Sequence, residues 1–140
     1  MRFARTCVTR SSPRPSVPPR AWRQRVLDIV ESAERIMALV RDVDVERFTS
    51  DPMLHDAVLY NLVIIGEAAR YVPAEVQARH ADVPWRDMRE MRNFVAHVYH
   101  GVSDRRVWKT INTDLPHLPA RLRQLLTDEP AAPGDSAGDG

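Results

Sequence analysis

Apolar residues recur at helical spacing through most of residues 21–126 of this 140-residue chain. In the first segment, about residues 21–43, they fall three or four positions apart, which places them on one stripe of a helix. The stripe consists of Val26, Ile29, Val30, Ala33, Ile36, Met37, Val40 and Val43. No useful stretch alternates apolar and polar residues as a half-buried strand does. We therefore expect a long amphipathic helix here and an all-α fold.

A second helix is predicted over about residues 52–71. Asp51 is a good N-cap, and Pro52 suits the first helical position because its missing N–H would have no partner there. One apolar stripe comprises Leu54, Val58, Leu62, Ile65 and Ala69, and a second comprises Ala57, Asn61, Ile64 and Ala68. Two stripes predict a helix that is buried on more than one side, either at the centre of a bundle or at a subunit interface.

The remaining segments continue the helical pattern. We expect a short helical turn at residues 74–80 and a main helix at about residues 84–100. The last helical region, residues 103–126, contains Pro116 and Pro119, which must break or kink it. The predicted architecture is therefore an all-α bundle of four to five helices with a kinked C-terminal helix.

Composition divides the chain into a domain and two tails. Residues 1–19 carry four arginines and no acid among several prolines, and residues 128–140 carry four acids and no base. We expect a disordered basic extension at 1–19, a helical domain at 20–127 and a disordered acidic tail at 128–140. The domain contains only two of the five glycines, which disfavours a turn-rich β-fold and excludes a glycine-rich nucleotide loop.

The single cysteine, Cys7, excludes an internal disulfide framework and a metal site built from several cysteines. No apolar run approaches the roughly 18 residues of a membrane span. We therefore expect a protein of the cytoplasm with no membrane segment, no metal and no cofactor. A metal site formed by Glu90, His97 and His100 would need these side chains on nearly one stripe, and their spacing makes it a weak alternative.

The helix at residues 84–100 carries the candidate chemistry. On a helical wheel, Met88, Met91, Phe94, Val95 and Val98 fall on one half. The opposite half collects Arg89, Arg92, Asn93, Ala96, His97, Tyr99 and His100. That arc contains no carboxylate, and guanidinium and imidazole groups together suit an anionic ligand such as phosphate. The alternative is a polar helix face packed against acidic neighbours.

These residue types fit RNA cleavage in particular. RNA supplies its own nucleophile, the 2′-hydroxyl, so the protein needs a base, an acid and positive charge at the phosphate, and a metal is not required. One His97 cannot easily serve as base and acid in a single step. Two copies could do so in a homodimer with a composite site, and His100 is the competing second imidazole. One bundle core should not bury both stripes of residues 52–71, so we expect that helix and the polar face to form the dimer interface.

The sequence MRNFVAHVY at residues 91–99 resembles the R-x4-H-x-Y motif of HepT-like toxins in the HEPN superfamily. The surroundings agree with this resemblance, because NLVIIGEA within residues 56–73 and PWRDMREMRN within residues 80–93 occur in the right order, followed by VWKTINTDLPHL at residues 107–118. The resemblance covers about residues 20–127, which is the whole predicted bundle.

The resemblance implies an all-α HEPN domain that dimerises with its motifs face to face. It implies a metal-independent ribonuclease that acts as the toxin of a type VII-like toxin–antitoxin system. The implied partner is an MntA-type minimal nucleotidyltransferase antitoxin, which transfers AMP to the motif tyrosine. The alternative is a HEPN module that binds RNA or nucleotide without cutting, or a scaffold for a nucleotidyltransferase.

Carried over by position, Arg92 and His97 match the catalytic pair, Asn93 matches the polar residue that follows the arginine, and Tyr99 matches the modified tyrosine. Arg89 and His100 are the further candidates for RNA binding. Two positions depart from the usual pattern: Val98 stands where many relatives have glycine, and His100 stands where an aromatic residue is frequent.

A few residues outside the motif receive structural interpretations. Trp85 and Trp108 are expected to be packing anchors at helix starts. Glu67 is expected to be a solvated residue or one at the edge of a dimer interface. His55 and His80 have no suitably spaced ligand partners in the sequence, so we expect them at the surface.

Overall fold

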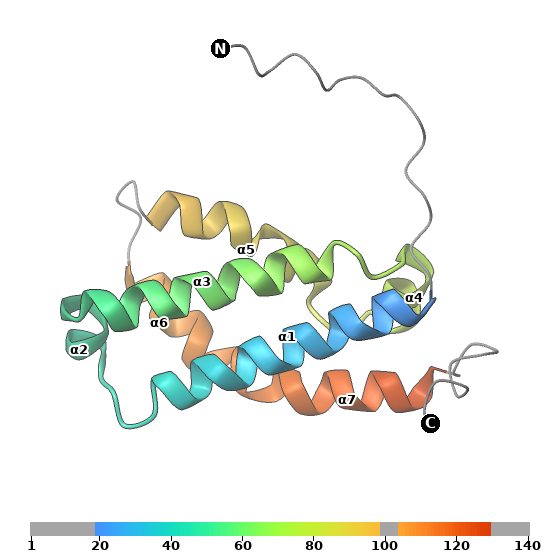
Figure 1. Ribbon diagram of the computed structural model, residues 1–140, viewed down its shortest axis with the longest axis horizontal. Coiled ribbons are helices and arrows are strands. Elements are labelled where there is room, and N and C mark those ends of the chain that lie inside the picture. Colours follow the sequence, from blue (N-terminus) through green and yellow to red (C-terminus); the bar gives the residue numbers. More distant parts are fainter. Residues whose placement is uncertain (1–18, 99–103, 130–140) are drawn as a thin grey trace, which may run out of the picture.

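The computed structural model describes residues 19–98 and 104–129 (Figure 1). Within these residues the elements are α1 (Pro19–Leu39), α2 (Val45–Ser50), α3 (Pro52–Ala69), α4 (Ala74–Arg79), α5 (Trp85–Val98), α6 (Asp104–Thr113), the 3-10 turn η1 (Leu115–His117) and α7 (Leu118–Asp128). The described part contains no strand. The expectation of an all-α bundle is therefore confirmed.

Four of the longer helices lie side by side in the order α5, α3, α1, α7 (Figure 1). Helix α1 packs against α3 on one side and α7 on the other, and its predicted apolar stripe supplies much of the core. The side chains of Val26, Ile29, Ala33 and Ile36 are completely buried. Burial at about 25 cal/mol per Å² of apolar surface is the main force that holds such helices together.

Helix α3 begins as the sequence predicts, because the Asp51 side chain accepts a hydrogen bond from the Leu54 N–H at 3.2 Å and Pro52 occupies the first turn. It lies between α1 and α5, and residues of both its stripes are buried within the single chain, among them Val58, Leu62, Asn61 and Ala68. The prediction that α3 stands at the bundle centre is confirmed. Ala57 and Ile64 of the second stripe are only half-buried, so the single chain covers that stripe in part, and a role of α3 in a dimer interface stays a prediction.

The six-residue helix α2 has no counterpart in the sequence prediction. Asp44 caps it by accepting from the Arg47 N–H at 2.8 Å, and Phe48 is its one buried residue. The Phe48 ring lies 5.1 Å from the His55 ring and 5.2 Å from the Trp108 ring, measured between centroids. A helix of this length offers too few apolar positions for a periodic pattern to be visible.

The C-terminal region breaks where the prolines predict. Helix α6 ends at Thr113, Pro116 lies in η1, and Pro119 lies in the first turn of α7. Helix α7 continues to Asp128, and the following residue, Glu129, is buried. These two acidic residues, assigned to the tail from sequence, therefore belong to the folded part.

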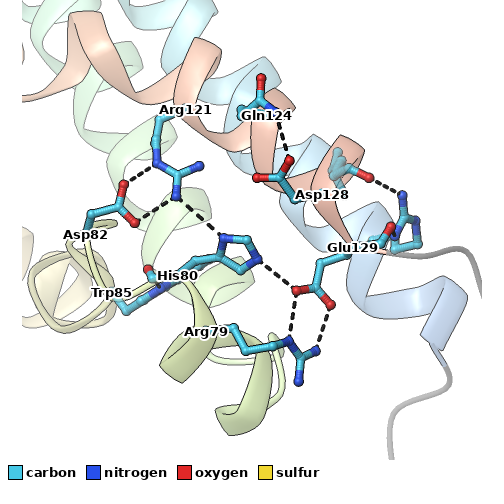
Figure 2. A network of polar contacts seen from close by, with 10 residues as sticks. Arg79, His80, Asp82, Trp85, Arg121, Gln124, Asp128 and Glu129 are labelled. Carbon is cyan, nitrogen blue, oxygen red and sulfur yellow. Dashed lines mark hydrogen bonds and ion pairs between the residues drawn. The ribbon is translucent and has the colours of Figure 1, made fainter.

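Glu129 is the centre of a polar network that joins α7 to α4 (Figure 2). Its carboxylate accepts two hydrogen bonds from Arg79, at 2.7 and 3.0 Å, and lies 2.8 Å from Nε2 of His80. These partners outweigh the effect of burial and lower the pKa of Glu129 to about 2. His80 is itself buried, so its expected surface position was wrong. Two elements distant in the sequence meet there, which local spacing cannot reveal.

Arg121 of α7 extends the same network toward α5 (Figure 2). Its guanidinium makes a two-pronged ion pair with Asp82, in the loop between α4 and α5, and this pair lowers the pKa of Asp82 to about 2. One Arg121 nitrogen also lies 3.5 Å from Nδ1 of His80. The network therefore fixes the end of α7 relative to the loop that leads into α5.

His55 is not a surface residue either. Its Nε2 lies 3.0 Å from the Asp104 carboxylate at the start of α6, and its side chain is only 16% exposed. This contact connects α3 to α6.

None of the helices in residues 19–98 and 104–129 combines the length and apolarity that crossing a bilayer requires.

Candidate active site

Helix α5 is anchored by its apolar half. Trp85 is buried at its start, and the indole Nε1 donates a hydrogen bond to the His80 carbonyl at 3.0 Å. Met88, Met91 and Val95 are also buried, as the helical wheel predicts. Trp85 is therefore a packing anchor as expected, and Trp108 packs partly buried on Phe48. With the apolar half fixed, the polar half must face outward.

The outward half presents the residues that the sequence selected. The side chains of Arg89, Arg92, Asn93 and Ala96 are all exposed. His97 belongs to the last turn of α5, five residues and about 7.5 Å along the axis from Arg92. Its side chain lies outside the described part of the chain, as do Tyr99 and His100 altogether.

Gly66 brings α3 unusually close to this face. A Cβ atom at that position would stand 3.0 Å from the Met88 carbonyl oxygen and 3.1 Å from the Arg92 backbone nitrogen. Both distances are shorter than side chains normally tolerate, so the absence of a side chain permits the crossing. The residue that follows, Glu67, is thereby placed beside Arg92.

Glu67 makes an ion pair with Arg92 across the two helices. Its Oε1 accepts from an Arg92 guanidinium nitrogen at 2.7 Å and from Arg70, one turn further along α3, at 3.3 Å. The Glu67 side chain is 37% exposed and that of Arg92 is 56% exposed. Glu67 is thus more than a solvated residue, and its possible place at a dimer edge stays a prediction.

Arg89 is held in a similar way by a neutral partner. Its guanidinium donates to Oε1 of Gln77 on α4, in a short hydrogen bond. The Gln77 amide nitrogen in turn donates to the Val72 carbonyl at 2.9 Å. The turn after α3 therefore orients the Gln77 amide. The amide in turn orients one edge of the Arg89 guanidinium and leaves the positive charge of Arg89 unneutralised.

The described part of this face carries more positive than negative charge. Of the three guanidiniums there, those of Arg70 and Arg92 pair with one carboxylate, that of Glu67, and that of Arg89 pairs with the neutral amide of Gln77. Glu90 pairs instead with Arg86 at 3.4 Å, on the neighbouring surface of α5. A face packed against acidic neighbours would show a balance of charge, so the excess favours an anionic ligand over that alternative.

The opposite flank of α5 differs in character. A cavity of about 260 Å³ lies between α5 and the α6–η1 segment, and Asp87, Glu90 and Asp114 line it together with apolar residues and Arg106. Its acidic lining is unsuited to a phosphate backbone. In residues 19–98 and 104–129 no three His, Cys, Asp or Glu side chains are grouped as metal ligands would be.

Sequence reasoning missed the roles of Glu67 and Gln77 at this face. Both belong to other helices, and helical periodicity within one segment cannot show which residues a second segment brings alongside. Gly66 was the available signal, since a lone glycine inside an apolar helix marks a close approach of another backbone.

The fold and the site together define an all-α bundle with a cationic face on helix α5. A family model described as "Ribonuclease HepT-like" matches residues 29–125. No solved structure matches the chain significantly.

The chain aligns with nearly the whole length of two relatives. A protein from Thermococcus cleftensis named a probable ribonuclease HepT is 36% identical over 106 residues, which is 76% of this chain and 96% of the relative. A protein from Caldanaerobacter subterraneus subsp. tengcongensis, whose name proposes it to be an RNase, is 33% identical over 111 residues, 79% of this chain and 96% of the relative. The chain therefore belongs to the HepT-like ribonuclease family, as the motif predicted, and its bundle is of the HEPN type.

Proposed function

We propose that this protein is a metal-independent endoribonuclease that cleaves RNA by attack of the 2′-hydroxyl on the adjacent phosphorus. The observation that carries the proposal is the exposed guanidinium of Arg92 on the face of α5 that also contains the position of His97, within a family of ribonucleases. Arg92 and His97 are the catalytic pair, and Asn93, one turn before His97, supplies a further donor to the phosphate.

The reaction needs one proton removed and one delivered. A base takes the proton from the 2′-hydroxyl, the 2′-oxygen bonds to phosphorus, and the bond to the 5′-oxygen breaks. An acid protonates the leaving oxygen, and the products carry a 2′,3′-cyclic phosphate and a 5′-hydroxyl. Imidazole can exchange protons near neutral pH, while Arg92 stabilises the charge that develops on the phosphate oxygens.

Two imidazoles would meet in a homodimer. The outer face of α3 presents Met53, which is 84% exposed, and Tyr60, which is 66% exposed, seven residues apart on one stripe. The half-buried Ile64 continues that stripe, which reaches Glu67 beside Arg92. A second copy packed on this stripe would bring its own His97 toward the first. His100 within the same chain is the competing second imidazole.

Dimerisation is tested by sedimentation velocity at micromolar concentration. We expect a dimer for the wild type, and a shift toward monomer for Tyr60→Glu because a carboxylate would be desolvated in the contact. A wild type that sediments as a monomer would contradict the composite site.

We extend the proposal to regulation. As the toxin of a type VII-like toxin–antitoxin system, this protein would be silenced by an MntA-type nucleotidyltransferase that adds AMP to Tyr99. Tyr99 is two residues past His97, near the end of the helix that carries Arg92. A phosphate attached there would compete with RNA for the same guanidinium groups.

Modification is measured by intact mass and RNase activity after incubation with the cognate nucleotidyltransferase and ATP. The wild type should gain AMP and lose activity, and Tyr99→Phe should do neither. Tyr71→Phe, which alters another exposed tyrosine outside the proposed dimer contact, is the matched control and should behave as wild type. Silencing of Tyr99→Phe with gain of AMP would overturn the assignment.

The catalytic proposal is tested with purified protein and RNA in EDTA. The wild type should cleave, and His97→Ala should not. His117→Ala removes an exposed histidine of η1, far along the chain from the motif, and should cleave as wild type. Activity that requires added Mg²⁺ or Mn²⁺, or equal cleavage by His97→Ala, would contradict the mechanism. A wild type that binds RNA without cutting it would support the alternative of a non-cleaving HEPN module or a nucleotidyltransferase scaffold.

A further inference from the structure

Glu67 touches the proposed site without belonging to its motif. Its Oε1 receives hydrogen bonds from Arg92 at 2.7 Å and from Arg70 at 3.3 Å. Among the residues that the structure describes, it is the carboxylate in contact with two of the three exposed arginines of this face. A negative charge next to a phosphate-binding arginine weakens the attraction for RNA, so its presence there calls for a compensating benefit.

The geometry around Glu67 is enforced by the backbone. Gly66 lets α3 approach α5 so closely that a Cβ atom would stand 3.1 Å from the Arg92 backbone nitrogen. The backbone at Glu67 and the backbone at Arg92 are therefore held at a nearly fixed distance from each other. The Glu67 carboxylate therefore acts from a rigid support. Sites supported by packed helices hold their side chains more accurately than sites on loops do.

A single contact of this kind leaves most of the guanidinium available. Arginine carries five N–H donors in a planar fork, and Glu67 engages one terminal nitrogen. Within residues 19–98 and 104–129 the Nε edge and the second terminal nitrogen make no hydrogen bond, so both can bind phosphate oxygens. Arg92 is more than half exposed, so without Glu67 its long side chain would sample many rotamers.

We propose that Glu67 is the positioning residue for Arg92: it fixes one edge of the guanidinium so that the other edge meets the scissile phosphate. This proposal rests on the proposed ribonuclease function. The Arg70 contact balances the Glu67 charge, so the carboxylate orients Arg92 while the face as a whole remains cationic.

The test compares Glu67→Ala and Glu67→Gln with the wild type. Misplacement of a catalytic group by about 1 Å costs up to about 100-fold in rate. We expect Glu67→Ala to lower kcat by about 10- to 100-fold with little change in KM. Glu67→Gln keeps an oxygen acceptor for Arg92 and should recover most of kcat. Wild-type kcat in Glu67→Ala would overturn the proposal, and so would an equal loss in both variants.

Two controls separate positioning from other effects. Glu34→Ala removes an equally exposed carboxylate that pairs with Arg123 at 2.7 Å on the α1–α7 side, and kcat should not change. In the Arg92→Ala background, adding Glu67→Ala should cause no further loss, because the group being positioned is absent. A full additional loss there would overturn the proposal.

A readout independent of catalysis keeps this proposal distinct from the proposed function. The guanidinium Nε–H signal of Arg92, assigned by its disappearance in Arg92→Lys, reports on side-chain order in NMR spectra. We expect a slowly exchanging, ordered signal in the wild type and in Glu67→Gln, and an averaged one in Glu67→Ala. If the wild type cleaves no RNA but this pattern holds, the ribonuclease proposal fails and the positioning contact stands. An averaged signal in the wild type overturns the positioning itself.

Discussion

The cationic face of α5 and the network at the end of α7 use the same residue types in different proportions. At the α5 face Arg70 and Arg92 pair with the carboxylate of Glu67, Arg89 pairs with the neutral Gln77, and the arginine side chains are exposed. In the α7 network two arginines meet two carboxylates, those of Asp82 and Glu129, and Glu129 is buried. The α5 face therefore carries a net positive charge, whereas the arginines and carboxylates of the α7 network balance each other.

This difference indicates what each cluster contributes. Hydrogen bonds from Arg79 and from the buried His80 lower the pKa of the buried Glu129 to about 2, so this interaction favours the folded state. Exposed ion pairs contribute only about 0–1 kcal/mol to stability. The α5 face is therefore expected to govern activity and the α7 network to govern stability. Substitutions at the α5 face should lower kcat with little change in the free energy of unfolding, and substitutions in the α7 network should do the reverse.

Arg92→Ala should produce the largest effect of all. Removing a donor aimed at developing charge lowers kcat by about 100- to 1,000-fold. The free energy of unfolding should change by less than about 1 kcal/mol, because the lost ion pair is exposed. RNA cleavage and urea unfolding are measured on the same preparation. Arg123→Ala also breaks a 2.7 Å pair with an exposed glutamate and should leave both quantities near wild type.

Glu129→Gln should show the reverse profile. The substitution leaves Arg79, which is more than half exposed, and the buried His80 without their charged partner, and losing hydrogen bonds to a buried charged group costs about 1.5–3 kcal/mol. Thermal and urea unfolding should detect this loss, while kcat for RNA should stay within about two-fold of wild type. A variant as stable as wild type with reduced cleavage would reverse the assigned roles of the two clusters.

The pH dependence of unfolding sharpens the same contrast. The folded-state pKa values of Glu129 and Asp82 are lowered to about 2 from 4.5 and 3.8. Their stabilisation is therefore complete above about pH 5 and is lost as the pH falls toward 2. For Glu129 the loss between pH 7 and pH 3 amounts to about 2 kcal/mol. Urea unfolding between pH 7 and pH 3 should show a smaller decline for Glu129→Gln than for wild type; parallel curves would contradict this account.

Gly66→Ala should have a smaller effect that touches both properties. The added methyl group would press on the Met88 carbonyl and the Arg92 nitrogen, and such overpacking costs about 1–3 kcal/mol, partly offset by the better helix propensity of alanine. We expect a net loss of about 1 kcal/mol and reduced cleavage, because Arg92 is displaced. A variant more stable than wild type would show that helix propensity alone decides at this position.

Much of the fold followed from periodicity. The long helices have wide apolar stripes, and Asp51 with Pro52 marks the start of α3 by side-chain chemistry that is local in the sequence. The polar and apolar halves of α5 were likewise predictable, because a single helix determines them. Helix α2 escaped prediction because Phe48 is its only buried residue.

The remaining features depend on contacts between distant segments. His80 and Glu129 are 49 positions apart, and they pair because the C-terminal end of α7 meets the C-terminal end of α4. The pairing of Glu67 with Arg92 similarly depends on the crossing of α3 and α5. Sequence patterns identified Arg92 through its motif, but the partner that holds it required the tertiary structure.

The chemical identity of the cut ends tests the central claim most directly. RNA of defined sequence is cleaved by the purified protein in EDTA, and the new termini are analysed by mass spectrometry. Attack by the 2′-hydroxyl, with Arg92 and His97 on the α5 face, predicts 2′,3′-cyclic phosphate and 5′-hydroxyl ends. Products with 3′-hydroxyl and 5′-phosphate ends would show that water was the nucleophile and would contradict the account.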